Sequence, residues 1–223
     1  MSRSIRIIPI IVLLFVILSP ADALLSGEVW EKTTEDKEHG IDVYTRTVEG
    51  SQIRAYQGRT TVEASLDALV SLMSDAASFP LWMHNVNSAR VLEIINDKER
   101  ITYVSQGVPW PVKDRDLVLY SELKINPDTG AVIINIEAWP DAYPEQEGHL
   151  RITEMKSSWA FTPKENGMVE VVYETHVDPG GRIPPRLVNA HTLDTPLNSL
   201  RGLREMIKRP EYRDAFMDVL HQN

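Results

Sequence analysis

Hydrophobic and polar residues alternate along most of the chain after residue 28, and this period is typical of half-buried β-strands. Turn-forming residues separate the alternating stretches, among them Gly40, residues 127–130 and Asn166–Gly167. The pattern predicts strands over residues 29–36, 41–50, 53–62, 89–96, 100–107, 116–125, 131–139, 148–163 and 168–177. We expect these strands to form an antiparallel sheet.

A helical period replaces the alternation after the third strand. In residues 63–75, apolar residues recur three and four positions apart, which predicts an amphipathic helix. Pro80 prevents a long continuation. Residues 76–85 are therefore expected to form a short second helix or turn that carries Trp82.

A longer helix is predicted near the C-terminus. Pro184 and Pro185 suit a first helical turn, and an apolar stripe continues from there to Ile207. Pro196 lies inside this stripe, so we expect a kink near Thr192.

The order of these elements predicts one α+β domain over residues 24–223, because no linker or repeat divides the chain. A curved sheet and one long helix can enclose a space, and ligand cavities form where such sheets curl. Residues 116–125 and 131–139 are in part apolar on both faces, as expected of strands that line an apolar interior. A plainly packed core explains them equally well.

Residues 1–23 have the pattern of a signal peptide. Two arginines precede an apolar core at residues 7–18, and the small residues of the Ala21–Ala23 segment suit cleavage after Ala23. The core is shorter than the roughly 20 residues of a membrane-spanning helix; an uncleaved anchor is the alternative. We expect residues 24–223 to be exported to the periplasm, the extracellular space or a secretory lumen.

The chain is acidic, with a formal net charge of −9, and it has no cysteine. Removal of residues 1–23 takes away two arginines and one aspartate and leaves −10. Such a protein is a poor partner for nucleic acid. Anionic membranes repel it weakly, so membrane contact is expected to be transient and apolar.

Sequence motifs for catalysis are weak. The six histidines include no pair four residues apart, as a zinc-binding helix requires, and no G-x-S-x-G elbow, P-loop or dinucleotide fingerprint occurs. No metal or cofactor is therefore expected. His176 with Asp178 and Asp114 with Asp116 are candidate acid–base pairs, but charges at strand ends more often form ion pairs.

Five stretches resemble landmarks of the START domain, the steroidogenic-acute-regulatory-related lipid-transfer family, and occur in the family's order. They are FPLWMHNVNSARVLE (79–93), VPWPVKDRDLVLY (108–120), YPEQEGHLRI (143–152), SSWAFTP (157–163) and HVDPGGRIPPRLVN (176–189). The resemblance extends from Trp30 to Lys208 and implies a helix-grip fold, in which a curved antiparallel sheet wraps the C-terminal helix and encloses a tunnel for one lipid. It also implies that this helix and the loop at residues 139–148 form a lid.

The resemblance bears on the ligand as well. Sterol-carrying relatives keep a buried acid and arginine in the tunnel, and Val104 and Ser121 occupy those positions here, which argues against a sterol held by that pair. Phosphatidylcholine carriers surround a quaternary ammonium group with aromatic rings. The aromatic residues available for that role are Tyr103, Trp110, Trp139 and Trp159.

Strand alternation places Arg115, at the start of an apolar strand, on the same face as Ser121. Arg115 either points into the tunnel or ties the strand end to a carboxylate outside, and a structural role is favoured. The predicted ligand-binding residues are Val104, Arg115, Leu117, Leu119, Ser121, Trp139, Asn189, Leu193 and Leu197.

The expected function is non-catalytic binding and transfer of one lipid or other hydrophobic molecule by a monomer. Two alternatives remain. A helix-grip enzyme of the cyclase or hydrolase type would need convergent acid–base groups inside the cavity, and an inward-facing His176 or His149 beside a carboxylate would favour it. A lipid-sensing interaction module would expose an apolar patch on its lid.

Overall fold

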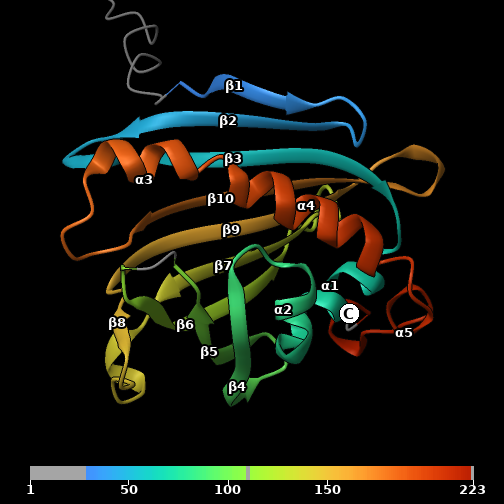
Figure 1. Ribbon diagram of the computed structural model, residues 1–223. Helices are drawn as coiled ribbons and strands as arrows, with labels where there is room; N and C mark the ends of the chain where they lie inside the picture. Colours follow the sequence, from blue (N-terminus) through green and yellow to red (C-terminus); the bar gives the residue numbers. More distant parts are fainter. Residues whose placement is uncertain (1–28, 109–110, 222–223) are drawn as a thin grey trace, which may run out of the picture.

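The computed structural model describes residues 29–108 and 111–221, which form one curved sheet with helices on its concave side (Figure 1). The strands are β1 (Glu31–Asp36), β2 (Ile41–Val48), β3 (Ser51–Glu63), β4 (Val86–Asn96), β5 (Glu99–Gln106), β6 (Asp114–Ile125), β7 (Val132–Ala138), β8 (His149–Arg151), β9 (Glu154–Pro163) and β10 (Met168–Asp178). Nine of them pair in the order β1-β2-β3-β10-β9-β7-β6-β5-β4, and all these pairs are antiparallel. The predicted α+β class and antiparallel sheet are thus confirmed.

One predicted strand is wrong. Residues 148–163 form two strands, and the first of them, β8, runs parallel to β6 from Asp114 to Asp116. The amide of Ile152 donates a hydrogen bond to the carbonyl of Asp116 at 2.9 Å, and the chain then enters β9. Alternation alone could not indicate this change, because both parts have a strand period.

The helices are α1 (Leu66–Ser74), α2 (Phe79–Trp82), α3 (Pro185–His191), α4 (Asp194–Met206) and α5 (Pro210–Arg213). Ser65 caps α1 by accepting a hydrogen bond from the Ala68 amide at 3.0 Å. The predicted short helix that carries Trp82 is α2.

The predicted C-terminal helix is present as α3 and α4, with the expected irregularity at Thr192 and Leu193. Proline has no amide hydrogen, so Pro196 cannot bond to the carbonyl of Thr192. Thr192 and Leu193 nevertheless keep right-handed helical backbone angles. The two helices therefore follow one another across the sheet (Figure 1).

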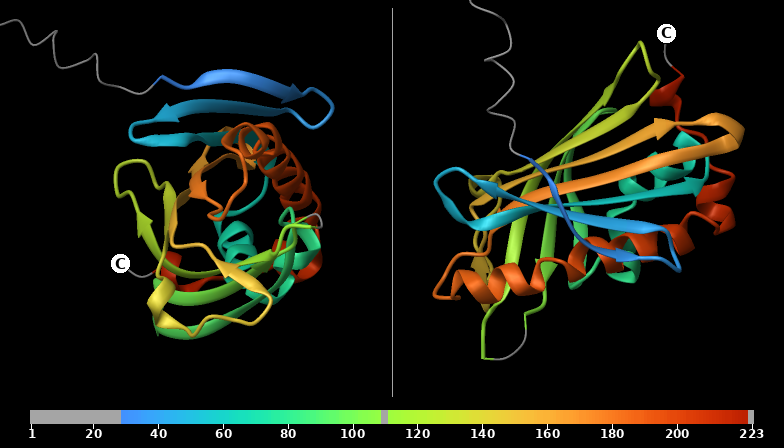
Figure 2. Two further views of the ribbon diagram at one scale, coloured as in Figure 1. Left: turned by 60° about the vertical axis from the view of Figure 1, so that its left-hand side comes forward. Right: turned by 90° about the horizontal axis from the view of Figure 1, so that it is seen from above.

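The sheet does not close on itself, and α4 lies at the opening (Figure 2). On one side α4 contacts β2 and β3, and on the other it contacts α2, which packs on β4. Two glycines permit this fit. A Cβ atom at Gly58 would lie 2.7 Å from Leu200, and a Cβ atom at Gly202 would lie 2.4 Å from the carbonyl oxygen of Trp82. Helix α4 thus packs closely on β3 and on α2, with no room for a side chain at either glycine, as in the expected helix-grip fold.

We expect Gly202→Ala to lower the free energy of unfolding by about 1–3 kcal/mol, because its Cβ would overlap backbone atoms of Trp82. Alanine otherwise stabilises a helix interior relative to glycine, so the sign is diagnostic. Urea unfolding measures the difference. Glu205→Ala, on the exposed side of the same helix, serves as control and should stay within about 0.5 kcal/mol. A stabilised Gly202→Ala protein would show that the contact is loose.

An ion pair also joins α4 to the β1–β2 turn. The Asp36 carboxylate accepts hydrogen bonds from Arg201 at 2.6 Å and from the His39 ring at 2.8 Å. Burial of the carboxylate opposes ionisation, but the hydrogen bonds from Arg201 and His39 prevail and lower its pKa to about 2.

This lowered pKa predicts a pH dependence of stability. The ionised Asp36 stabilises the folded protein above its ordinary pKa of 3.8, and the contribution is lost as the pH falls towards 2. The Tm of the wild type should therefore fall more steeply between pH 4 and pH 2 than the Tm of Asp36→Asn. Parallel curves for the two proteins would contradict the assigned role of Asp36.

Candidate functional site

The register between β5 and β6 shows which side chains face the interior. Val104 lies opposite Leu117, and both belong to the main core cluster, to which α4 also contributes. Successive side chains on a strand point to opposite faces. Arg115, Leu119 and Ser121 therefore share the inner face with Leu117, as the alternation predicted.

The outer face of the same strands carries a separate cluster of Ile101, Tyr103 and Val118, against which Tyr143 packs. Tyr103 is therefore not available to a ligand in the interior. Trp159 is inside, fully buried and stacked on Tyr173 with 4.1 Å between ring centroids. Trp110 lies outside the described residues.

The interior contains both fully buried and partly buried apolar side chains. Near α1, inner-face residues such as Trp159, Phe161 and Leu200 are fully buried. Several inward apolar side chains further along β6, near the end of β10 and on α4 are only partly buried, whereas Leu117 near the start of β6 and its neighbour Val104 on β5 are buried. The partly buried side chains of the interior include Ala89, Val91, Leu119, Ile136, Met155, Val177, Leu193 and Leu197. These partly buried side chains keep some accessible apolar surface.

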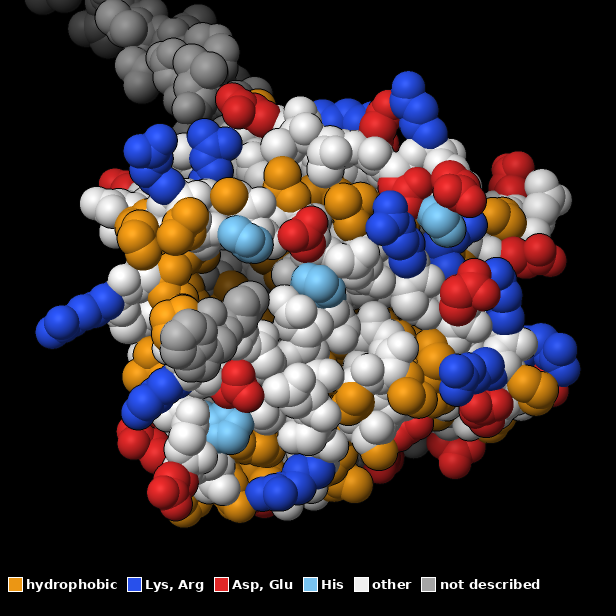
Figure 3. Space-filling view, in the orientation of Figure 1, with side chains coloured by type: hydrophobic (Ala, Val, Ile, Leu, Met, Phe, Trp, Pro, Cys, Tyr) orange, Lys and Arg blue, Asp and Glu red, His pale blue; other side chains and the backbone are white. Residues whose placement is uncertain are grey.

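A pocket of about 340 Å³ opens between the start of β6 and the segment before α3. We call it the mouth pocket, and a hollow is visible on this side of the molecule in Figure 3. Its apolar lining consists of Val112, Leu150, Ile183, Pro184 and Leu187. Gly181 and the cationic residues Lys113, Arg115 and Arg182 complete it.

Arg115 joins the two walls of the mouth pocket. Its guanidinium donates to the carbonyl of Lys113 at 2.5 Å, of Pro179 at 3.0 Å and of Gly180 at 3.1 Å. Only 3% of the residue is exposed, and burial lowers its pKa. Arg115 therefore faces inward, yet it holds loop carbonyls rather than the carboxylate that the structural hypothesis envisaged. Neither of the two expected alternatives describes it fully.

Asp116 points to the opposite side and pairs with Arg151. Two guanidinium nitrogens of Arg151 donate to the Asp116 carboxylate at 3.0 and 2.9 Å, and this hydrogen bonding raises the pKa of Arg151. Their side chains are 0% and 5% exposed. Arg151 also donates to the carbonyls of Pro140, Tyr143 and Pro144. Consecutive residues of β6 thus fix a loop on each side of the sheet.

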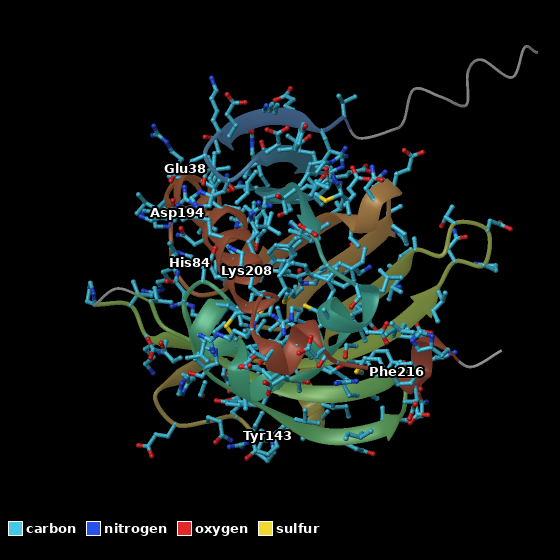
Figure 4. The ribbon with its side chains drawn as sticks, turned by 90° about the vertical axis from the view of Figure 1, so that its right-hand side faces the viewer. Glu38, His84, Tyr143, Asp194, Lys208 and Phe216 are labelled. Carbon is cyan, nitrogen blue, oxygen red and sulfur yellow. The ribbon has the colours of Figure 1, made fainter. Side chains whose placement is uncertain are left out.

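This arrangement corrects the predicted lid. The loop at residues 139–148 is held on the outer face by Arg151, and Tyr143 lies at the outer surface, away from α4 (Figure 4). The structure therefore does not place this loop over the interior.

Two predicted ligand-binding residues are also elsewhere. Trp139 lies one residue beyond β7, packs edge-on against Tyr120 on the outer face and is 45% exposed. Asn189 accepts a hydrogen bond from the Arg54 amide and donates to the Gln52 carbonyl, so its amide group fastens α3 to β3. Leu193 and Leu197 pack against the main cluster.

The candidate acid–base pairs do not meet in the interior. His176 lies within 3.2 Å of the Ser51 hydroxyl, and His149 lies within 2.9 Å of the Ser105 hydroxyl, on the outer face of β5. Asp114 accepts hydrogen bonds from a loop amide, while Asp116 is paired with Arg151. Neither His176 nor His149 therefore supplies the inward histidine beside a carboxylate that would favour a helix-grip enzyme.

Within residues 29–108 and 111–221, no three metal-ligating side chains of the His, Cys, Asp or Glu type gather in one place. In the same part of the chain, no helix has the length and apolar character needed to span a bilayer.

Sequence reasoning missed the mouth residues Lys113, Arg182 and Leu187, and also Arg100. Arg100 lies opposite Ser121 on the inner face and donates to the carbonyl of Ser74 at 3.2 Å. The sequence shows the three mouth residues only as charged or apolar side chains in or beside Pro- and Gly-rich loops. Such loops have no side-chain period, so the sequence does not predict where their side chains point. For Arg100, the alternation that oriented Ser121 would have been sufficient.

Comparison with known proteins gives consistent results. The model of the START domain matches residues 19–212. An uncharacterized protein of Pseudomonas aeruginosa is 34% identical over 183 residues, which cover 82% of this chain and 89% of the relative. The phosphatidylcholine transfer protein of Bos taurus is 27% identical over 169 residues, or 74% and 78% of the two chains.

Solved structures show the same similarity. A fragment of the STAR-related lipid transfer protein of Xanthomonas axonopodis has a TM-score of 0.75 and 34% identity, and the match covers 81% of this chain and 99% of that one. Human STARD10 has a TM-score of 0.73, with 86% and 80% of the chains covered. At 19% identity it supports the fold alone.

We expect Asp116→Asn to reduce the free energy of unfolding by about 3–5 kcal/mol, since it leaves the buried Arg151 guanidinium without its counter-charge. Asp214→Asn, which removes the exposed pair with Arg213, is the control and should cost less than about 1 kcal/mol. Urea unfolding separates the two values. Equal, small losses would show that the Asp116–Arg151 pair does not organise the sheet.

Proposed function

Because the chain belongs to the START domain family, we propose that it binds a single lipid or other hydrophobic molecule in the interior of its sheet and transfers it without chemistry. The observation that carries this proposal is the partly buried apolar inner face behind the mouth pocket. Burial of apolar surface supplies about 25 cal/mol per Å² towards affinity, before the cost of association.

Transfer requires contact with a membrane, and the mouth supports a brief apolar one. Leu187, which lines the mouth pocket, is 54% exposed. It lies on α3, next to the irregular turn at Thr192 and Leu193. We propose that this end approaches the bilayer while the protein remains a monomer.

Export remains part of the proposal. Its support is the signal-like pattern of residues 1–23, which lie outside the described residues. Detection of a mature chain that begins at Leu24 in a secreted or periplasmic fraction would test it.

The lipid-sensing module is the second candidate function, and the exposed Leu187 at the mouth favours it to a limited extent. The two functions differ in outcome. A transfer protein moves labelled lipid between vesicles by itself, whereas a sensor holds its lipid and needs a partner protein.

The interior site predicts a size effect on binding. We expect the wild type to extract a fluorescent phospholipid from vesicles and Leu119→Trp to extract at least tenfold less, because the indole would occupy part of the interior. The control is Tyr120→Trp, at the adjacent position on the outer face, which should stay within about twofold. Failure of the wild type to extract lipid of any class would overturn the proposed function.

A further inference from the structure

The mouth pocket contains only positive charge. Lys113 and Arg182 line it together with the buried Arg115, and none of its other lining residues is charged. The whole chain has 32 acidic residues against 23 lysines and arginines. A pocket lined by three cationic residues and by no carboxylate is therefore unusual for a chain of this composition. The pocket is a local positive region in an acidic protein.

The carboxylates nearest in sequence are engaged elsewhere. Asp114 accepts hydrogen bonds from the Val108 amide at 3.1 Å and from Asn87 at 3.4 Å, and it offsets part of the charge of Arg115. Asp178 accepts from the Gly180 amide at 2.8 Å. Among the described residues, neither Lys113 nor Arg182 forms an ion pair. Both side chains are exposed and available to an anionic ligand.

We propose that the mouth pocket binds the anionic group, a phosphate or a carboxylate, of the lipid whose chains occupy the interior. This inference rests on the proposed function and adds to it the class of ligand and its orientation. Cationic side chains bind phosphate and carboxylate oxygens through charge-assisted hydrogen bonds. Their partly apolar surroundings at the mouth strengthen that attraction relative to open water.

The apolar residues that line the mouth pocket suggest how the lipid is oriented. Val112, Leu150 and Ile183 are apolar and suit the first carbons of the chains. Met155 and Val177 are partly buried residues of the interior that can contact the chains further in. Burial of an unpaired anion deeper in the interior would be costly, and the positions that carry a charged pair in sterol carriers hold Val104 and Ser121 here.

Arg100 is the rival anchor, since it is the other arginine on the inner faces of β5 and β6. It donates to the carbonyl of Ser74, the last residue of α1, and so lies beside α1 rather than at the mouth. If Arg100 held the anionic group, the lipid would be reversed. Its substitution therefore belongs in the same experiment.

The test is a competition measured by native mass spectrometry. The full mature chain is mixed with vesicles of equal parts phosphatidylglycerol and phosphatidylcholine, and the ratio of the two bound lipids is read directly. We expect the wild type to favour phosphatidylglycerol by about tenfold, and the variant Lys113→Gln/Arg182→Gln to lose most of this preference while it still binds lipid. The control Lys37→Gln/Lys208→Gln, which has the same net charge away from the mouth, should keep the preference.

Each other outcome counts against the proposal. A wild-type ratio near one, with lipid bound, overturns the inference and leaves the proposed function intact; no bound lipid overturns the proposed function. Loss of preference in Arg100→Gln but not in the mouth variant reverses the orientation. The same competition in a nonionic detergent removes the anionic bilayer surface. A preference that disappears there would show that the mouth cations attract the membrane rather than the bound lipid.

Discussion

The structure depends on two neighbouring side chains of β6 that point in opposite directions. Arg115 turns inward and holds the carbonyls of residues 179 and 180, which lead to α3. Asp116 turns outward and holds Arg151, which in turn holds the loop at residues 140–144. Because successive residues of a strand alternate between its faces, a single Arg-Asp dipeptide fixes the chain on both sides of one sheet. Both groups are buried, so their partners are indispensable.

This constraint explains how the two walls of the mouth pocket are held together. The guanidinium of Arg115 cross-links the start of β6 to the segment before α3, and the mouth pocket lies between them. Its three backbone acceptors are neutral carbonyl groups, so its positive charge remains. Behind it, apolar residues of the sheet and of α4 remain partly accessible. At the far end, Gly58 and Gly202 allow α4 to pack closely on β3 and α2. The molecule is thus closely packed where the helix crosses, and the mouth pocket lies where Arg115 holds the segment before α3.

Local pattern was sufficient for much of this fold. Alternation located eight strands correctly and placed Leu117, Leu119 and Ser121 on one face, because burial on one side imposes that period. It failed where contacts with residues distant in sequence determine the direction of a side chain or the pairing of a strand. Trp139 is only one residue past β7, and there it turns to the outer face to meet Tyr120. Asn189 bonds across 135 residues to the Arg54 amide, and β8 lies parallel to β6 because Arg151 meets Asp116. No local period encodes such pairings.

The central claim is that the ligand lies inside the sheet, behind the mouth held by Arg115. Photo-crosslinking tests this most directly: the protein takes up a phospholipid with a photoreactive acyl chain, and peptide mass spectrometry locates the attached residues. The account predicts crosslinks on inward residues such as Leu119, Met155 and Leu197. Crosslinks concentrated on the outer face, at Trp139 or Tyr143, would contradict it.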